Sequence, residues 1–165
     1  MYHRTFIFAV CSVKAETVFQ RIKYFLESVK AKSFGGMTIF SKIIAGQIPS
    51  YKIAENEKFF AFLDIFPLRE GHVLVVPKNE TDKLFDLPDE YLDEMLLFAK
   101  PIAHAIEKAF KCNRCGLSVI GLEVPHAHIH LIPINSANDL NFVQSKLQAT
   151  AESLKNTQEK ILAHL

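Results

Sequence analysis

Three histidines alternate with small or apolar residues in one short segment, which reads His126, Ala127, His128, Ile129, His130. In an extended strand, side chains two positions apart point to the same face, so the three imidazoles are expected to share one surface. A neutral imidazole can act as a nucleophile, carry a proton or bind a metal near neutral pH. The surface that carries the three rings is therefore a candidate for chemistry.

The elements that must position this surface are short strands and a few helices. Apolar residues recur at helical spacing from Ile39 to Ile44 and stop at Gly46, which predicts a short helix. A longer apolar stripe at spacings of three and four predicts a helix from Pro88 to about Phe110. Strands are expected over residues 51–55, 58–65, 72–77, 117–120 and 127–134, and a terminal helix over 141–165. Strands and helices that do not alternate regularly favour an α+β fold with an antiparallel sheet.

The composition is that of one globular domain. The chain has 165 residues, 49% of them hydrophobic and 22% charged, which is enough to build a core. A net charge of +1 provides no overall field for nucleic acid or acidic membranes, so neither is expected as a partner. Three cysteines are too few for a disulfide framework, which favours a reducing compartment and predicts a cytoplasmic protein.

Charge divides the chain near residue 36. Residues 1–36 hold six basic and two acidic residues, a net charge of +4, and end in Gly35 and Gly36 before Met37. We therefore predict a basic extension at 1–36, either helical or disordered, then the main domain at 37–140 and a C-terminal helix at 141–165. A signal peptide, a transit peptide and an upstream start codon chosen in error remain alternatives for residues 1–36.

The segment His126-Ala-His-Ile-His130-Leu-Ile resembles the signature of the histidine triad (HIT) family, in which three histidines alternate with apolar residues. The resemblance covers about residues 37–135, through Thr38–Pro49, Phe60–Ile65 and Gly71–Pro77. It implies a five-stranded antiparallel sheet with flanking helices, paired into a homodimer with a continuous sheet. It also implies hydrolysis or transfer at the α-phosphorus of adenosine phosphoramidates or dinucleoside polyphosphates, through a covalent nucleotidyl-histidine.

The resemblance assigns a role to each histidine. His128, the middle one, would attack phosphorus, with a backbone carbonyl fixing its tautomer. His126 would help to orient the site. His130 would donate a hydrogen bond to a phosphate oxygen as charge develops. The scheme requires no metal and no other cofactor.

Further residues match positions that bind a purine nucleotide in the family. Asp64 resembles an acid that accepts hydrogen bonds from both ribose hydroxyls. His72 matches a position that is more often structural than catalytic. The predicted base pocket consists of Phe62, Ile65, Ile39, Phe40, Ile43 and Leu74. For Phe62 and its aliphatic neighbours, a role in the core is an equally good interpretation.

The chain departs from the family pattern in front of the triad and at a cysteine pair. Leu122 replaces an amide and Glu123 a hydroxyl residue; Glu123 is included among the substrate-binding candidates because a carboxylic acid could protonate a leaving group. Thr38 and Ser41 stand where some members carry zinc-binding cysteines, which argues against that zinc site. Cys112 and Cys115 have metal-like spacing but no second pair nearby.

Two other functions remain open at the level of sequence. A metal-dependent hydrolase could use a His-x-His pair with Glu123 as base. A nucleotide-binding protein that has lost turnover would keep the pocket without the chemistry. Resistance to chelators separates the first from a HIT enzyme, and a covalent adduct that disappears in His128→Ala separates the second.

Overall fold

The described part of the chain is built around one five-stranded antiparallel sheet. The computed structural model describes residues 36–165, so the predicted basic extension lies outside the described residues. Strands follow one another across the sheet in the order β1-β2-β3-β5-β4. The α+β class and the five-stranded antiparallel sheet predicted from the sequence are confirmed. The strands are β1 (Lys52–Glu55), β2 (Phe59–Leu63), β3 (Val73–Pro77), β4 (Arg114–Ser118) and β5 (Ile129–Ile134).

The pairing register divides the sheet into two faces. On one face, Phe62 of β2 lies opposite Leu74 of β3, and Leu74 lies opposite His130 of β5. The adjacent row, which points the other way, contains Val73 and Leu131. Both of these side chains are buried in the core. The histidine-bearing strand therefore presents His130 to the same face as two of the predicted pocket residues.

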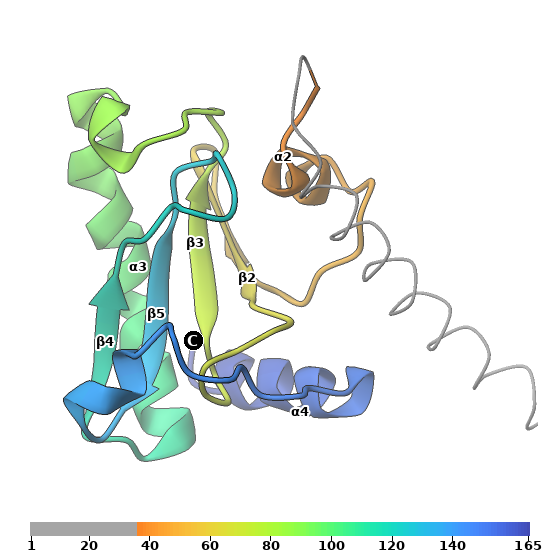
Figure 1. Ribbon diagram of the computed structural model, residues 1–165, viewed down its shortest axis with the longest axis vertical. Helices are drawn as coiled ribbons and strands as arrows, with labels where there is room; N and C mark the ends of the chain where they lie inside the picture. The colour runs from red at the N-terminus through yellow and green to blue at the C-terminus, as the bar shows by residue number, and fades with distance from the viewer. Residues whose placement is uncertain (1–35) are drawn as a thin grey trace, which may run out of the picture. The chain divides into compact units, whose positions relative to one another are not determined.

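Two helices cover parts of the core, and a short third helix lies across the strands from the longer of them. The long helix α3 (Asp89–Phe110) contacts β3, β4 and β5, and α4 (Ala151–Leu162) contacts α3 and β1. Figure 1 shows α3 at the left, behind β4 and β5, and the short helix α2 (Ile39–Ile44) at the right. Thr38 caps α2 by accepting a hydrogen bond from the Ser41 backbone N–H. Two 3₁₀ turns, η1 (Leu84–Asp86) and η2 (Ala137–Leu140), complete the elements.

The turn between β2 and β3 requires a glycine. Gly71 has φ +93°, and a Cβ at this position would lie 2.4 Å from the ring of Phe110 at the end of α3. The positive φ and the close approach both exclude a larger residue. The turn packed in this way leads directly into His72 and β3.

Several elements differ in extent from the sequence-based expectation. Strand β2 is shorter than the predicted 58–65, and β5 begins at Ile129 rather than at residue 127, so His126 and His128 lie before the strand. The terminal helix begins only at Ala151, because the Thr150–Ser153 capping box starts it there and residues 141–150 run as irregular chain. The strand expected at 117–120 is β4, which starts earlier, at Arg114, and ends at Ser118. Within residues 36–165, no helix combines the length and the apolar character that crossing a membrane requires.

Candidate active site

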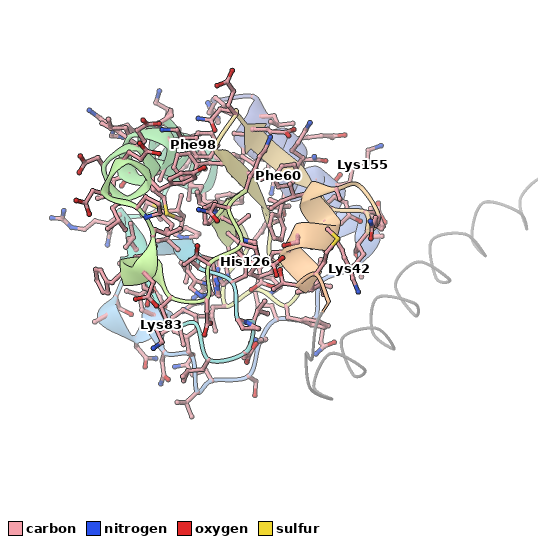
Figure 2. The ribbon with its side chains drawn as sticks, turned by 90° about the horizontal axis from the view of Figure 1, so that it is seen from above. Lys42, Phe60, Lys83, Phe98, His126 and Lys155 are labelled. Carbon is pink, nitrogen blue, oxygen red and sulfur yellow. The ribbon has the colours of Figure 1, made fainter. Side chains whose placement is uncertain are left out.

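The three histidines of the motif are all buried and lie together. His130 belongs to β5, whereas His126, in a bend, and His128 precede the strand. The ring centroids of His128 and His130 are 4.9 Å apart. Phe40 of α2 packs edge-on against His126 at 5.8 Å and against His128 at 5.1 Å. Figure 2 shows His126 in the interior beside α2.

The tautomer of His128 follows from one hydrogen bond. Its Nδ1 lies 2.6 Å from the carbonyl oxygen of His126. A carbonyl can only accept, so the proton is on Nδ1 and the lone pair is on Nε2. Burial lowers the pKa of His128 below its usual value, which keeps the ring neutral. A neutral ring with a fixed lone pair on Nε2 is the form that a nucleophilic histidine requires.

His130 carries its proton on the opposite side, and His72 is the reason. The Leu68 backbone N–H donates to His72 Nδ1 at 3.2 Å, so the proton of His72 is on Nε2. His72 Nε2 donates in turn to His130 Nδ1 at 2.9 Å. The proton of His130 is therefore on Nε2.

The Nε2–H of His130 is a buried donor without a partner. Among the described residues, it is the buried side-chain polar atom that lacks a hydrogen bond. An unsatisfied buried donor is unfavourable unless a ligand completes it. Burial lowers the pKa of both His130 and His72 to about 3, so both rings stay neutral. His130 can therefore offer one N–H to an acceptor that arrives with a substrate.

His126 is held by a different set of contacts. Its Nε2–H donates to the Pro77 carbonyl at 2.8 Å, so Nδ1 accepts from the Thr38 hydroxyl at 2.7 Å. The Ser41 hydroxyl donates to Glu80, which also accepts from the Thr38 backbone N–H at 3.3 Å. The bond from Ser41 lowers the pKa of Glu80. This chain of hydrogen bonds through Thr38, Ser41 and Glu80 attaches the start of α2 to His126.

Three of the predicted pocket residues, Phe40, Phe62 and Leu74, lie together beside the triad. The ring of Phe40 packs edge-on against Phe62 at 5.5 Å. Phe62 and Leu74 continue in register to His130. Of the remaining candidates, Ile39 is buried, and Ile43 and Ile65 are half-buried.

Asp64 lies at the end of β2, on the Phe62 side of the sheet. Its Oδ1 accepts from the Phe66 backbone N–H at 2.8 Å, and its Oδ2 is 3.5 Å from His72 Nδ1. Burial raises the pKa of Asp64, although the bond from Phe66 opposes this shift. A cavity of about 240 Å³ borders Asp64 and His72 and reaches α4.

Glu123 faces solvent beside a lysine. Its side chain is 78% exposed, and its Oε2 lies 3.2 Å from Lys146 Nζ. The charge of Glu123 contributes to raising the pKa of His128, although burial outweighs it. The neighbouring Leu122, which replaces the amide, is 89% exposed.

Several residues of the site had no signal in the local sequence. Glu80 reaches Ser41 across 39 positions. Phe142 packs edge-on against His130 at 4.9 Å, and Lys146 pairs with Glu123 across 23 positions. Thr38 and Ser41 entered the sequence analysis only as replacements for cysteines. Contacts of this kind depend on how distant segments meet, which periodicity does not report.

The HIT domain family model matches residues 45–137. Among curated proteins, the chain is 44% identical over 100 residues to "Adenosine 5'-monophosphoramidase HNT1" of Saccharomyces cerevisiae, which covers 58% of this chain. The aligned part spans 61% of that protein's length. A HIT-like protein of Borreliella burgdorferi is 34% identical over 131 residues, covering 74% of this chain and 94% of its own length.

A solved structure shows the same fold. The crystal structure of a Hit-like protein from Bartonella henselae superimposes with a TM-score of 0.69 at 29% identity, over 81% of this chain and 100% of that one. The family model covers more than half of the chain, and the Borreliella protein aligns over nearly its whole length. The resemblance seen in the motif is thereby confirmed, and the chain belongs to the histidine triad (HIT) family.

Proposed function

We propose that this chain is a HIT-type nucleotide hydrolase or transferase. It would cleave at the α-phosphorus of adenosine phosphoramidates or dinucleoside polyphosphates through a covalent nucleotidyl-His128. One observation carries the proposal: the lone pair of His128 Nε2 is fixed beside the unpartnered Nε2–H of His130. The name of the yeast relative, a 5'-monophosphoramidase, supports the phosphoramidate class.

The chemistry proceeds in two displacements. His128 Nε2 forms a bond to phosphorus as the bond to the leaving group breaks, and the leaving group departs with that electron pair and takes up a proton. His130 Nε2–H donates to a phosphate oxygen and stabilises the charge that develops in the transition state. Water then attacks phosphorus and loses a proton, while the phosphorus–nitrogen bond breaks and returns its pair to Nε2. A nucleotide acceptor in place of water would give transfer.

Substrate binding is assigned to the pocket beside the triad. The purine would pack against the Phe40–Phe62 pair, with Leu74 as the floor toward His130. Asp64 would accept from the ribose hydroxyls, since its carboxylate lies on the Phe62 side at the strand end. Ile39, Ile43 and Ile65 would complete the walls.

The test is whether the full chain forms a covalent adenylyl adduct. We expect purified protein incubated with adenosine 5'-phosphoramidate and EDTA to hydrolyse it. Rapid quenching in alkaline denaturant, in which a phosphorus–nitrogen bond to histidine persists, should trap one adenylyl group detected by intact mass. His128→Ala should show neither adduct nor turnover, with a rate loss on the order of 10⁴-fold or more. The matched control is His104→Ala, which removes a 62% exposed imidazole on α3. Turnover that persists in a folded His128→Ala protein would contradict the mechanism.

The alternative of a binder without turnover is decided by the same experiment. Such a protein would retain AMP in a binding assay yet form no adduct and release no product. Equal binding by the wild type and His104→Ala, with no adduct in either, would favour it.

A metal-dependent hydrolase remains the second candidate because one group of ligands exists. In residues 36–165, ligand atoms of Asp64, His72 and His130 lie within 4.8 Å of one another. However, His72 Nε2 and His130 Nδ1 already share a hydrogen bond at 2.9 Å, which a metal would have to break. Activity that is lost in EDTA and restored by Zn²⁺ would favour this candidate over the covalent histidine.

We further propose that two copies pair through the edge of the sheet at β4. Strand β4 ends the strand order, so one side of its backbone has no strand partner in the described sheet. Leu117, Val119 and Ile120, on and just after this strand, are 46%, 41% and 39% exposed. Light scattering should report a dimer that Leu117→Asp weakens. A monomer at all concentrations would contradict the pairing.

A further inference from the structure

Residues 141–150, which we call the crossing segment, run past the triad between η2 and α4. Phe142 packs edge-on against His130 at 4.9 Å. The Leu147 backbone N–H donates to the Pro67 carbonyl at 2.8 Å, in the turn that follows Asp64. Both ends of the segment are therefore attached to the site, and Lys146 lies between these attachments. The HIT family model ends at residue 137, before this segment.

Lys146 reaches back to the loop in front of the triad. Its Nζ lies 3.2 and 3.4 Å from the two carboxylate oxygens of Glu123. The lysine side chain is 34% exposed, whereas that of Glu123 is 78% exposed. The ammonium is thus held by an exposed partner in the loop that precedes His126.

The buried histidines provide no positive charge for a bound phosphate, whereas Lys146 carries one. Burial keeps the triad histidines and His72 neutral by lowering their pKa values. A nucleotide phosphate arrives with negative charge, and neutral N–H donors stabilise it less than a cation does. The positive charge of Lys146 acts on the same groups: it opposes the burial-driven rise of the Asp64 pKa and adds to the lowering at His72.

We propose that Lys146 binds the phosphate of the nucleotide, exchanging its ion pair with Glu123 for an ion pair with the substrate. Glu123 holds the ammonium in the empty site and competes with phosphate for it. An exposed ion pair contributes little free energy, so the exchange costs little. This inference rests on the proposed function, and it makes Glu123 a residue that weakens phosphate affinity rather than one that supports it.

The experiment measures binding of AMP and of adenosine to the full chain by calorimetry at low salt. We expect Lys146→Met to weaken AMP binding about tenfold, as the loss of one charge-assisted hydrogen bond predicts. Lys146→Arg should retain most of the affinity. Glu123→Gln should strengthen AMP binding by about threefold, because it removes the competing carboxylate. Adenosine, which lacks the phosphate, should bind all these variants equally.

The matched control is Lys155→Met, which removes one positive charge from a 69% exposed side chain on α4. Figure 2 shows Lys155 at the periphery of the molecule. Because it changes the net charge as Lys146→Met does, an equal loss of AMP affinity in both would reduce the effect to overall charge and overturn the proposal. A thermal melt of each variant establishes that it is folded.

The opposite signs separate binding from structure. If the ion pair only fastens the crossing segment, Lys146→Met and Glu123→Gln should weaken binding in the same direction, and adenosine should be affected with AMP. That result, or unchanged AMP affinity in Lys146→Met, overturns the role of Lys146 while the proposed function stands. A wild type that binds neither adenosine nor AMP overturns both.

Discussion

Two groups of hydrogen bonds flank His128, and they end differently. On one side, His126 is closed within the protein: Pro77, Thr38 and the Glu80 carboxylate account for the chain of donors and acceptors. On the other side, the chain from Leu68 through His72 ends at the Nε2–H of His130, which has no partner within residues 36–165. We call the hydrogen bonds around His126 the closed group, because they hold His126 and the start of α2 in place. We call the hydrogen bonds that end at His130 the open group, because they leave a donor that a ligand can accept.

The difference assigns unequal roles to two histidines of the same motif. His126 uses both ring nitrogens on the protein, so it can orient α2 and the carbonyl that fixes His128 but has no proton left for substrate. His130 uses one nitrogen on His72 and keeps the other available. Under the proposed function, identical residue types at identical spacing would thus acquire a positioning role and a direct role through their partners.

Among changes to these two groups, removal of the Nε2–H donor of His130 is expected to lower kcat most. His130→Ala should lower kcat by about 10² to 10³-fold, the usual range for one donor that stabilises transition-state charge. Single-turnover kinetics with adenosine 5'-phosphoramidate measure it, with His104→Ala as the control. If KM rises while kcat is unchanged, His130 binds the ground state instead.

The next largest loss of kcat is expected when His72, which fixes the tautomer of His130, is replaced. His72→Phe removes the donor to His130 Nδ1, and we expect a fall in kcat of about 10 to 100-fold, as for partners that orient a site ligand. His72→Gln, which retains an N–H donor, should recover part of it. Equal activity of the two variants would show that the His72 hydrogen bond does not set the state of His130.

Lowering the pH should reduce the free energy of unfolding through His72 and His130 of the open group, because their protonation is coupled to unfolding. His72 and His130 have folded pKa values of about 3, below the unfolded value of 6.5, so the unfolded chain binds protons first as pH falls. Stability present above pH 6.5 is then lost, by about 2 kcal/mol for each histidine between pH 6.5 and 5. Urea unfolding at several pH values measures the slope. His130→Asn should flatten it by about one proton, and an unchanged slope would contradict the assignment.

Removing the Thr38 hydroxyl from the closed group should have the smallest effect on kcat. Thr38→Val keeps the shape but removes both the donor to His126 Nδ1 and the side-chain cap of α2, so we expect the free energy of unfolding to fall by about 1 to 2 kcal/mol. The effect on kcat should stay below about tenfold, since His126 only orients. Thr38→Ser restores the hydroxyl and serves as the control. A loss of kcat as large as that of His130→Ala would remove the distinction between the two groups.

The parts of the molecule that follow local rules could be predicted. Strands were expected around Phe62, Leu74 and His130, and they form as β2, β3 and β5, with the register placing these three residues on one face. The short helix from Ile39 to Ile44 and the long helix to Phe110 were also visible in the spacing of apolar residues. In each case the periodicity of the element carries the information.

The remaining features depend on encounters between distant segments. No local pattern reports that Glu80 meets Ser41 or that Phe142 covers His130. The terminal helix was expected from residue 141, but residues 141–150 are irregular because the Leu147 N–H bonds to Pro67 rather than within a helix. Strand order likewise follows from packing of the whole sheet.

The row from Phe62 through Leu74 to His130 sets a length scale for any ligand laid along it. Adjacent strands lie about 4.8 Å apart, so the two aromatic positions that end this row are separated by roughly 10 Å. That span matches the reach from a purine ring to its 5'-phosphate, and β4 is the next strand beyond His130. A bound nucleotide would therefore lie across the strands, with whatever is attached to phosphorus directed toward β4. In the proposed dimer this is the edge at which the second copy pairs, so leaving groups would approach the partner, and the row would discriminate by the distance between base and phosphate.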